Sequence, residues 1–189
     1  MVKDNLIFKH ENLQALKDEL LSSKNDAALF KNIVNLPFKY KLEVTKLSLG
    51  IIVLLQVNKT TSTIDRVALS ENELAEGTKK MSAKRFENIR IPVGFKGNII
   101  SEAIETGKPL STSDWQFLFA PELSPQESRF NQAGGGIAYS VVYPLKSRDG
   151  GALIFSFYQY FEEVTQGHHD FMKDYSRVVD SILNKKDRS

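Results

Sequence analysis

The chain of 189 residues contains no cysteine. Without a thiol it cannot form a disulfide, a thiolate metal site, a cysteine nucleophile or a thioether link to a chromophore. Hydrophobic residues make up 41% of the chain and charged residues 25%, which are ordinary fractions for a soluble globular protein. This length suits one domain, with or without an accessory helix, and allows a core that needs no covalent cross-links.

Long hydrophobic runs and a charge excess of one sign are also missing. The longest apolar stretch, residues 47–57, is interrupted by Ser48 and Gln56 and is shorter than the ~20 residues of a membrane span. The N-terminus lacks a signal-peptide core. The 25 basic and 23 acidic residues are spread along the chain, and the basic residues at 185–188 suit a solvated helix end. We therefore expect a cytoplasmic protein with neither membrane nor nucleic acid as a partner.

Amphipathic helices are predicted at both ends of the chain. Leucines recur at three- and four-residue steps within residues 10–36, where Asn25 and Asp26 are candidate helix caps after a break and Pro37 ends the pattern. Residues 165–184 carry an apolar stripe with the same spacing. Shorter helices are expected at residues 71–82 and 98–106.

The segments between these helices indicate a sheet. Their β-branched and alternating residues predict strands, which we place within residues 41–58, 63–70, 86–93, 110–111, 137–146 and 152–160. The Asp149-Gly150 pair is typical of a hairpin turn between the last two. Residues 114–136 show no clear period, and a loop of that length in a compact domain is usually functional or locally helical.

Two motifs match a known family when they are taken in order. Residues 91–109 read as a strand, a Pro-x-Gly-x-x-Gly turn and a helix that ends in Thr-Gly-x-Pro, and Asp114 follows them in a loop. Residues 140–157 read as a small-residue stretch, a strand that ends in Pro144-Leu145, a glycine turn and an apolar strand. In these features the chain resembles a GAF domain over most of its length.

The resemblance implies an α+β fold related to PAS domains. Its central antiparallel sheet would have five to six strands, with the N- and C-terminal helices on one face and pocket-forming loops and short helices on the other. We expect a helical extension at residues 1–27, the GAF-like domain at 28–185 and a polar tail at 186–189. No output domain follows Ser189, which implies a domain that stands alone.

The resemblance also implies a small-molecule or chromophore pocket and dimerisation through the terminal helices. The absence of cysteine excludes the mechanism of the family's methionine sulfoxide reductases and of its cysteine-linked bilin receptors. Cyclic-nucleotide binders carry an Asn-Lys pair before a Phe-x-x-x-Asp-Glu string, which residues 157–171 lack, so a cyclic nucleotide is disfavoured. The sequence assigns no cofactor.

The candidate ligand-binding residues lie in the irregular segment and on the last two strands. Aromatic side chains could stack on a ligand, while Asp114 and Arg129 could orient its polar groups. The same residues could simply fill a core, and both interpretations stay open. The candidates are Asp114, Trp115, Phe117, Phe119, Arg129, Phe130, Tyr139, Val141, Tyr143, Ser156 and Tyr158.

Other chemistry finds little support in the sequence. The three glycines at 134–136 could admit a ligand or act as a flexible connector, but they lack the Lys-Ser/Thr of a phosphate loop. On a helix, the adjacent His168 and His169 would point about 100° apart, so we predict no metal site. No serine lies in a Gly-x-Ser-x-Gly motif, and we predict no catalytic residues and no enzyme activity.

Two functions from different classes follow. The first is a cytoplasmic sensor and signalling domain that binds an unidentified small molecule and relays this through its terminal helices to a protein partner. The alternative is a ligand-free scaffold for dimerisation or protein interaction. A pocket plugged by Trp115 or Phe119 would favour the scaffold, whereas an enclosed space of several hundred Å3 beside Tyr139, with two or three convergent polar groups, would favour sensing.

Overall fold

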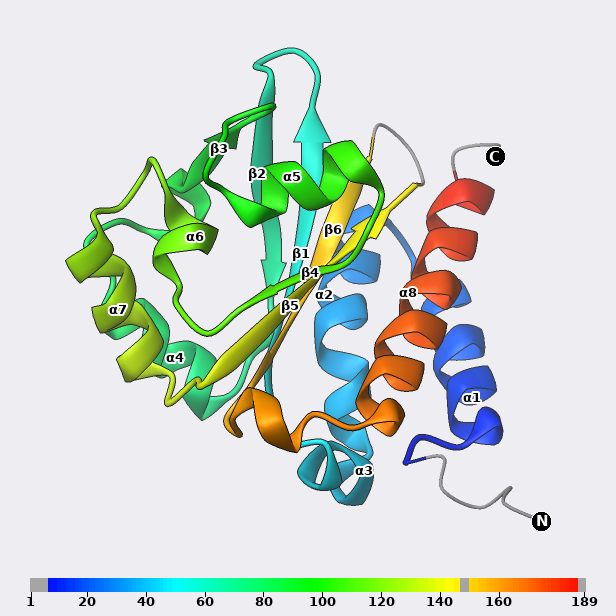
Figure 1. The fold of residues 1–189 in the computed structure, drawn as a ribbon. Helices are drawn as coiled ribbons and strands as arrows, with labels where there is room; N and C mark the ends of the chain where they lie inside the picture. The colour runs from blue at the N-terminus through cyan, green and yellow to red at the C-terminus, as the bar shows by residue number, and fades with distance from the viewer. Residues whose placement is uncertain (1–6, 147–149, 187–189) are drawn as a thin grey trace.

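The computed structural model describes residues 7–146 and 150–186 and shows an α+β fold around one sheet (Figure 1). The sheet has six strands in the order β3-β2-β1-β6-β5-β4, and every neighbouring pair is antiparallel. The strands are β1 (Leu49–Asn58), β2 (Thr63–Leu69), β3 (Arg90–Pro92), β4 (Leu110–Thr112), β5 (Tyr139–Leu145) and β6 (Gly151–Phe157). The expected strand number and pairing are therefore confirmed, while Asp149 of the predicted turn lies outside the described residues.

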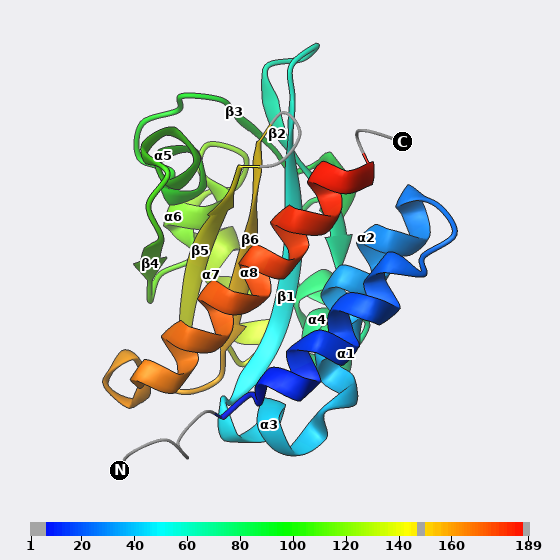
Figure 2. The ribbon, with the colours of Figure 1, turned by 90° about the vertical axis from the view of Figure 1, so that its right-hand side faces the viewer.

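Helices cover both faces of this sheet. The described helices are α1 (His10–Leu21), α2 (Asp26–Asn35), α3 (Lys41–Lys46), α4 (Glu73–Lys80), α5 (Ile99–Thr106), α6 (Gln116–Phe119), α7 (Pro125–Gly134) and α8 (Gln166–Lys186), with short 3-10 turns at Leu36–Lys39, Phe86–Asn88 and Phe161–Glu163. Figure 2 shows α1, α2 and α8 side by side on one face of the sheet, which we call the helix side. Helices α4 to α7 lie across the other face, which we call the roof side (Figure 1).

The strands' alternation divides the core between these two sides. On β1, Ile52 and Leu54 pack toward the terminal helices, whereas Ile51, Val53 and Leu55 pack toward the roof. The helix side is rich in aromatic contacts, and the ring centroids of Phe155 on β6 and Phe171 on α8 are 5.8 Å apart. Successive side chains along a strand therefore point alternately into the helix-side core and into the roof-side core.

Two segments differ from their sequence-based interpretation, and a third is locally helical, which is one of the two possibilities that the sequence left open. Lys41–Lys46 forms α3 rather than the start of a strand, because its polar residues leave only Val44 buried and Thr45 bonds back to the Lys41 carbonyl oxygen. The predicted strand at residues 86–93 is reduced to Arg90–Pro92 after a 3-10 turn. The irregular segment at residues 114–136 contains α6 and α7.

The expected terminal helices are confirmed with small changes at their ends. Asn25 caps α2 by accepting a hydrogen bond from the Ala28 backbone N–H, as its place after the break predicts. The left-handed residue Gly107 ends α5, at φ 66°. Among the described residues, no helix is long and apolar enough to cross a membrane.

Candidate functional site

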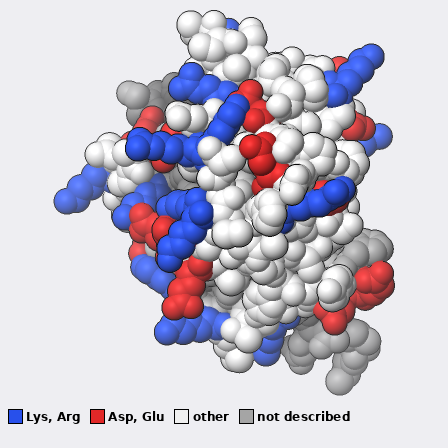
Figure 3. Space-filling view, turned by 90° about the vertical axis from the view of Figure 1, so that its left-hand side faces the viewer, with Lys and Arg blue, Asp and Glu red and all other residues white. Residues whose placement is uncertain are grey.

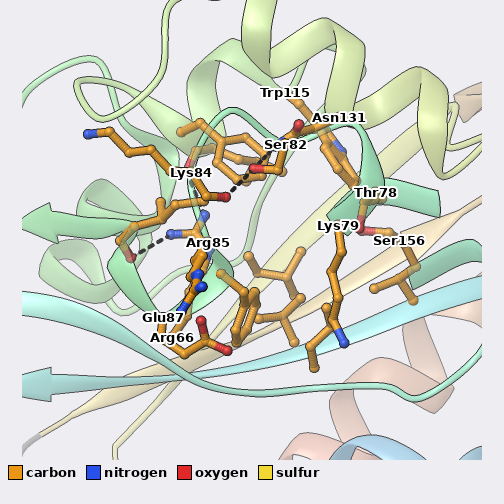
Figure 4. A pocket seen from close by; sticks show the side chains of 18 residues that line it. Arg66, Thr78, Lys79, Ser82, Lys84, Arg85, Glu87, Trp115, Asn131 and Ser156 are labelled. Atoms are coloured by element: carbon orange, nitrogen blue, oxygen red, sulfur yellow. Dashed lines mark hydrogen bonds between the residues drawn. The ribbon is translucent and has the colours of Figure 1, made fainter. Parts of the chain in front are cut away.

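A cavity of about 400 Å3 lies between the roof side of the sheet and the helices above it (Figure 4). Its floor comes from β1, β2 and β6, and its roof comes from α4, α6, α7 and the segment before β3. Half of its 18 lining residues are apolar, namely Ile51, Val53, Leu69, Phe86, Ile89, Trp115, Leu118, Phe119 and Ile154. This combination of size and lining is typical of small-molecule sites.

Arg66 is the one charged side chain among the buried residues of this cavity wall in the described chain. It follows Ile64 at the roof-facing register of β2 and is 7% exposed. Its Nη1 donates to the Ile89 carbonyl oxygen at 3.3 Å and its Nη2 donates to the Leu118 carbonyl oxygen at 3.2 Å. Its guanidinium carbon lies 4.7 Å from the centroid of the Phe119 ring. The side chain therefore joins the sheet to the roof.

Burial sets the electrostatics of Arg66. Removal from water lowers the pKa of its guanidinium to about 9, although the carboxylate of Glu122 acts in the opposite direction. Glu122 itself is bonded to Lys84 at 2.9 Å. Within the described chain no carboxylate contacts Arg66, so the direct contacts of this buried positive charge are two carbonyl oxygens and an aromatic face, while Glu122 acts on it from a longer distance.

A hydrogen-bonded chain connects the roof to strands β5 and β6 of the sheet. The indole Nε1 of Trp115 donates to Ser140 Oγ on β5 at 2.8 Å, and Ser140 Oγ lies 2.8 Å from Ser156 Oγ on β6. All three side chains are buried. The bonds fix the indole ring as one wall of the cavity, and they place two hydroxyl groups beneath it.

Asn131 on α7 supplies the second polar group with unused capacity. Its Nδ2 donates to Ser82 Oγ at 3.2 Å, and Ser82 Oγ donates in turn to the Lys84 carbonyl oxygen. Because the serine hydroxyl has used its proton, Asn131 must direct its NH2 at the serine. Asn131 Oδ1 is then a buried acceptor without a hydrogen bond in the described structure.

A capping box and close glycine contacts position helices α4 and α7 of the roof. Ser124 and Glu127 form a capping box that starts α7. Glycines let α4 and α7 meet backbone to backbone, since a Cβ on Gly77 would lie 2.0 Å from the Gly134 carbonyl oxygen. Gly134, from the predicted run of three glycines, therefore serves helix packing.

Basic side chains surround the cavity mouth. Lys79, Lys84 and Arg85 line it beside one acid, Glu87. Figure 3 shows the face that lies on the left-hand side of Figure 1. Lys and Arg side chains gather on one half of that face, with fewer acidic side chains among them. Lys79 pairs with Glu76 at 2.7 Å and Lys84 with Glu122 at 2.9 Å, so these carboxylates offset part of the positive charge at the mouth.

The structure brings only part of the candidate set to the cavity. Trp115, Phe119 and Ser156 line it. Asp114 and Arg129 instead pair outside it, with Asp114 Oδ2 2.7 Å from Arg129 Nη2, and this hydrogen bond lowers the pKa of the Asp114 carboxyl.

The other candidates lie elsewhere. Phe117 and Phe130 are exposed, by 42% and 49%. The strand residues Tyr139, Val141 and Tyr143 pack on the helix side. Tyr139 and Tyr158 also border a separate surface hollow near residues 111–113.

Sequence reasoning missed Arg66 and Asn131. The signal for Arg66 was present, because a charged residue two positions after Ile64 falls on the buried face of a strand. Asn131 required α7, and the Ser124-Pro125-Gln126-Glu127 string is a helix-start signature that could have indicated it.

Metal binding has no support from the described residues, among which no group of three or more metal-ligating side chains comes together. His168 lies at the start of α8, where it bonds to backbone groups and contacts the side chains of Thr165 and Gln159 rather than another metal-ligating side chain.

Comparisons with known proteins agree on the fold. No family model and no curated protein matches the sequence. Solved structures match it at low identity. The GAF domain of a phosphoenolpyruvate-protein phosphotransferase from Coxiella burnetii is 13% identical with a TM-score of 0.62, and the match covers 98% of each chain. Free methionine-R-sulfoxide reductase from Neisseria meningitidis is 12% identical with a TM-score of 0.60, over 98% of this chain and 95% of that one. A methyl-accepting chemotaxis protein is 10% identical with a TM-score of 0.60, over 95% and 99%. The chain has the GAF fold.

Proposed function

We propose that this protein is a sensory domain whose small-molecule ligand occupies the cavity between the sheet and the roof. One observation carries the proposal: the space of about 400 Å3 has apolar side chains in its walls and two buried polar groups with unused capacity, on Arg66 and Asn131. A buried charge and a buried unbonded acceptor are both unfavourable in an unliganded site. Ligand binding would relieve both.

The sheet offers a route from this site to the terminal helices. Trp115 bonds to Ser140 near the start of β5 and through it to the paired Ser156 near the end of β6. Phe155, the neighbour of Ser156, points to the opposite face and packs edge to face on Phe171 and Tyr175 of α8. A ligand that moves Trp115 would therefore change how α8 packs on the sheet. We propose that a protein partner, or a second copy of the chain, reads this shift at α1 and α8.

The comparisons support a regulatory role in general terms. Two of the similar structures are parts of a phosphotransferase and of a chemotaxis protein. The third is a methionine sulfoxide reductase, but a chain without cysteine has no thiol for a cysteine-dependent reaction. We therefore propose binding rather than catalysis.

The ligand-free scaffold has weaker support. That alternative predicts a pocket filled by Trp115 or Phe119, whereas both side chains stand at the cavity wall beside the remaining space. On α1, Leu21 is a large hydrophobic residue with 39% exposure, which is a small apolar surface for a dimer.

The single tryptophan provides a direct test. We expect a fragment library of acids, amines and neutral compounds to contain members that shift the Trp115 indole N–H signal in an NMR spectrum, together with backbone signals of α8. A filled cavity can be mimicked by Ile154→Phe, which should remove the response while the fold is retained. The proposal is wrong if no fragment class changes the indole signal of the native protein.

A further inference from the structure

We infer that the cavity selects a small organic monocarboxylate with an apolar body, and that Arg66 binds the carboxylate. The inference rests on the proposed function, because it assigns a ligand class to the same cavity. It goes beyond that function by naming the charge, the shape and the anchoring residue of the ligand.

The first argument is charge. Arg66 is 7% exposed and keeps its positive charge at neutral pH, since burial lowers its pKa only to about 9. Buried charges in proteins are nearly always paired or bonded to an opposite charge. Here the described chain supplies two carbonyl oxygens and the face of Phe119, and no carboxylate in contact. An anionic ligand would supply the missing charge.

The second argument is hydrogen-bonding capacity. A guanidinium has five N–H donors, and the contacts to Ile89 and Leu118 use one on each terminal nitrogen. The remaining donors suit the two oxygens of one carboxylate, which arginine binds through two parallel hydrogen bonds. The carbonyl contacts also hold the side chain in place before the ligand arrives, which lowers the entropy lost on binding.

The third argument separates a carboxylate from a phosphate. Arg66 is the one cation of the lining that is buried, while Lys79, Lys84 and Arg85 are exposed at the mouth. One enclosed positive charge matches a monoanion, whereas a phosphate ester carries nearly two negative charges and three acceptor oxygens. Half of the lining residues are apolar, aromatic rings among them, which suits a hydrocarbon or aromatic body.

Asn131, on the opposite part of the cavity wall, favours a ligand that also carries a hydrogen-bond donor. Asn131 Oδ1 accepts no hydrogen bond in the described structure, and it comes from α7, whereas Arg66 comes from β2. Figure 4 shows both residues among the side chains around the same space. A ligand that carries an N–H or O–H group on its apolar body would satisfy this acceptor.

The test uses matched acids and amides on the whole protein. Phenylacetate, indole-3-acetate and 4-methylpentanoate are titrated by calorimetry and by Trp115 fluorescence, each beside its primary amide, which has almost the same shape and no charge. We expect at least one acid to bind and its amide to bind roughly 10- to 100-fold more weakly, as the loss of a charged hydrogen-bonded pair implies. Inorganic phosphate should not displace the bound acid.

Variants assign the effect to one side chain. Arg66→Gln should weaken the acid by the same factor and leave the affinity for the amide nearly unchanged, while Arg66→Lys keeps the charge and should retain part of the preference. Arg90→Gln, an exposed control on β3, should bind like the native protein. The inference is overturned if none of the three acids binds, if amides or phosphate bind as well as the acids, or if Arg66→Gln keeps the preference. If amides bind as well as acids, the carboxylate inference is wrong but the proposed sensory function is not. If no fragment class changes the Trp115 signal, both the inference and the proposed function are wrong.

Discussion

One sheet separates two cores of different character. On the helix side, aromatic rings from β6 and α8 pack closely, and Phe171 and Tyr175 stack with centroids 5.7 Å apart. On the roof side, the strands face a cavity of about 400 Å3. Close packing gives dispersion contacts on all sides of a ring, and a cavity removes part of them. We therefore expect the helix side to contribute more to stability, whereas the roof side leaves a space that the proposed ligand could occupy.

The two sides also treat ionisable groups differently. His168 on the helix side is 2% exposed, and burial lowers its pKa, so it is neutral at pH 7. Arg66 on the roof side is 7% exposed and remains charged. On the helix side the neutral ring of His168 is satisfied by its hydrogen bonds, whereas on the roof side the charge of Arg66 has no carboxylate in contact, which fits the proposed binding site.

The largest expected effect is on the helix side. Phe155→Ala should lower the free energy of unfolding by about 3–5 kcal/mol, because it leaves a cavity among rings that touch Phe155 on several sides. Phe119→Ala removes the same atoms beside a space that already exists, so its effect should be clearly smaller. Urea denaturation measures both, with the exposed Phe117→Ala as the matched control. Equal losses for Phe155 and Phe119 would contradict the contrast between the two sides.

Many of the helices and strands could be predicted from the local sequence. The alternation on the strands, the cap at Asn25 and the glycine stop at Gly107 depend on neighbours within a few residues, and they predict the strands, α2 and α5. The family resemblance then supplied the order of the elements. These signals and the resemblance predict an α+β sheet with the terminal helices on one face, and the structure confirms it.

The site was harder because it depends on register and long-range contacts. Tyr139, Val141 and Tyr143 share one face of β5, but the pattern of that strand does not say which face meets the roof. Arg66 meets Leu118 across 52 residues of sequence, and Asn131 meets Ser82 across 49. Such pairs follow from the packing of α6 and α7 over the sheet, which no local pattern encodes.

The second expected effect concerns a hydrogen bond within the helix side. The hydroxyl of Tyr175 donates to the Ile33 carbonyl oxygen at 2.6 Å, and burial raises the pKa of this hydroxyl well above its ordinary range. Tyr175→Phe should lower the free energy of unfolding by about 1–2 kcal/mol, because the carbonyl oxygen is left buried without its donor. The same change at the exposed Tyr158 should have almost no effect in the same denaturation experiment. A neutral Tyr175→Phe would show that the carbonyl finds another partner.

The third effect is a dependence of stability on pH. His168 Nδ1 accepts a hydrogen bond from the Thr165 backbone N–H at 3.1 Å, so Nε2 carries the proton and donates to the Leu47 carbonyl oxygen at 3.0 Å. A second proton would have to enter at Nδ1, against that N–H, and burial and the nearby His169 also disfavour the charged ring. The folded-state pKa therefore lies below the ordinary value of about 6.5.

The sign follows from proton uptake. At pH below about 6.5 the unfolded chain binds a proton at this position before the folded chain does, so stability is constant above that pH and decreases as the pH falls toward the folded-state pKa. Denaturation midpoints at pH 7.5 and 5.5 measure the loss. His168→Gln should reduce the loss, while His169→Gln, the exposed neighbour, should keep most of it, because His169 is the smallest of the causes that lower the pKa of His168. An identical pH profile for the native protein and His168→Gln would contradict this assignment.

The smallest expected effect on stability is at Arg66, although its effect on ligand binding should be large. Arg66→Met removes two hydrogen bonds to carbonyl oxygens, which is unfavourable, and it removes a buried charge without a counterion, which is favourable. These contributions oppose each other, so the free energy of unfolding should change by less than about 1 kcal/mol in either direction. Urea denaturation without ligand measures it, beside Arg90→Met on the exposed face of β3. A loss as large as that of Phe155→Ala would mean that Arg66 holds the roof on the sheet. A near-zero change would mean that the fold does not need this charge, and that its place in the cavity is explained by what the cavity binds.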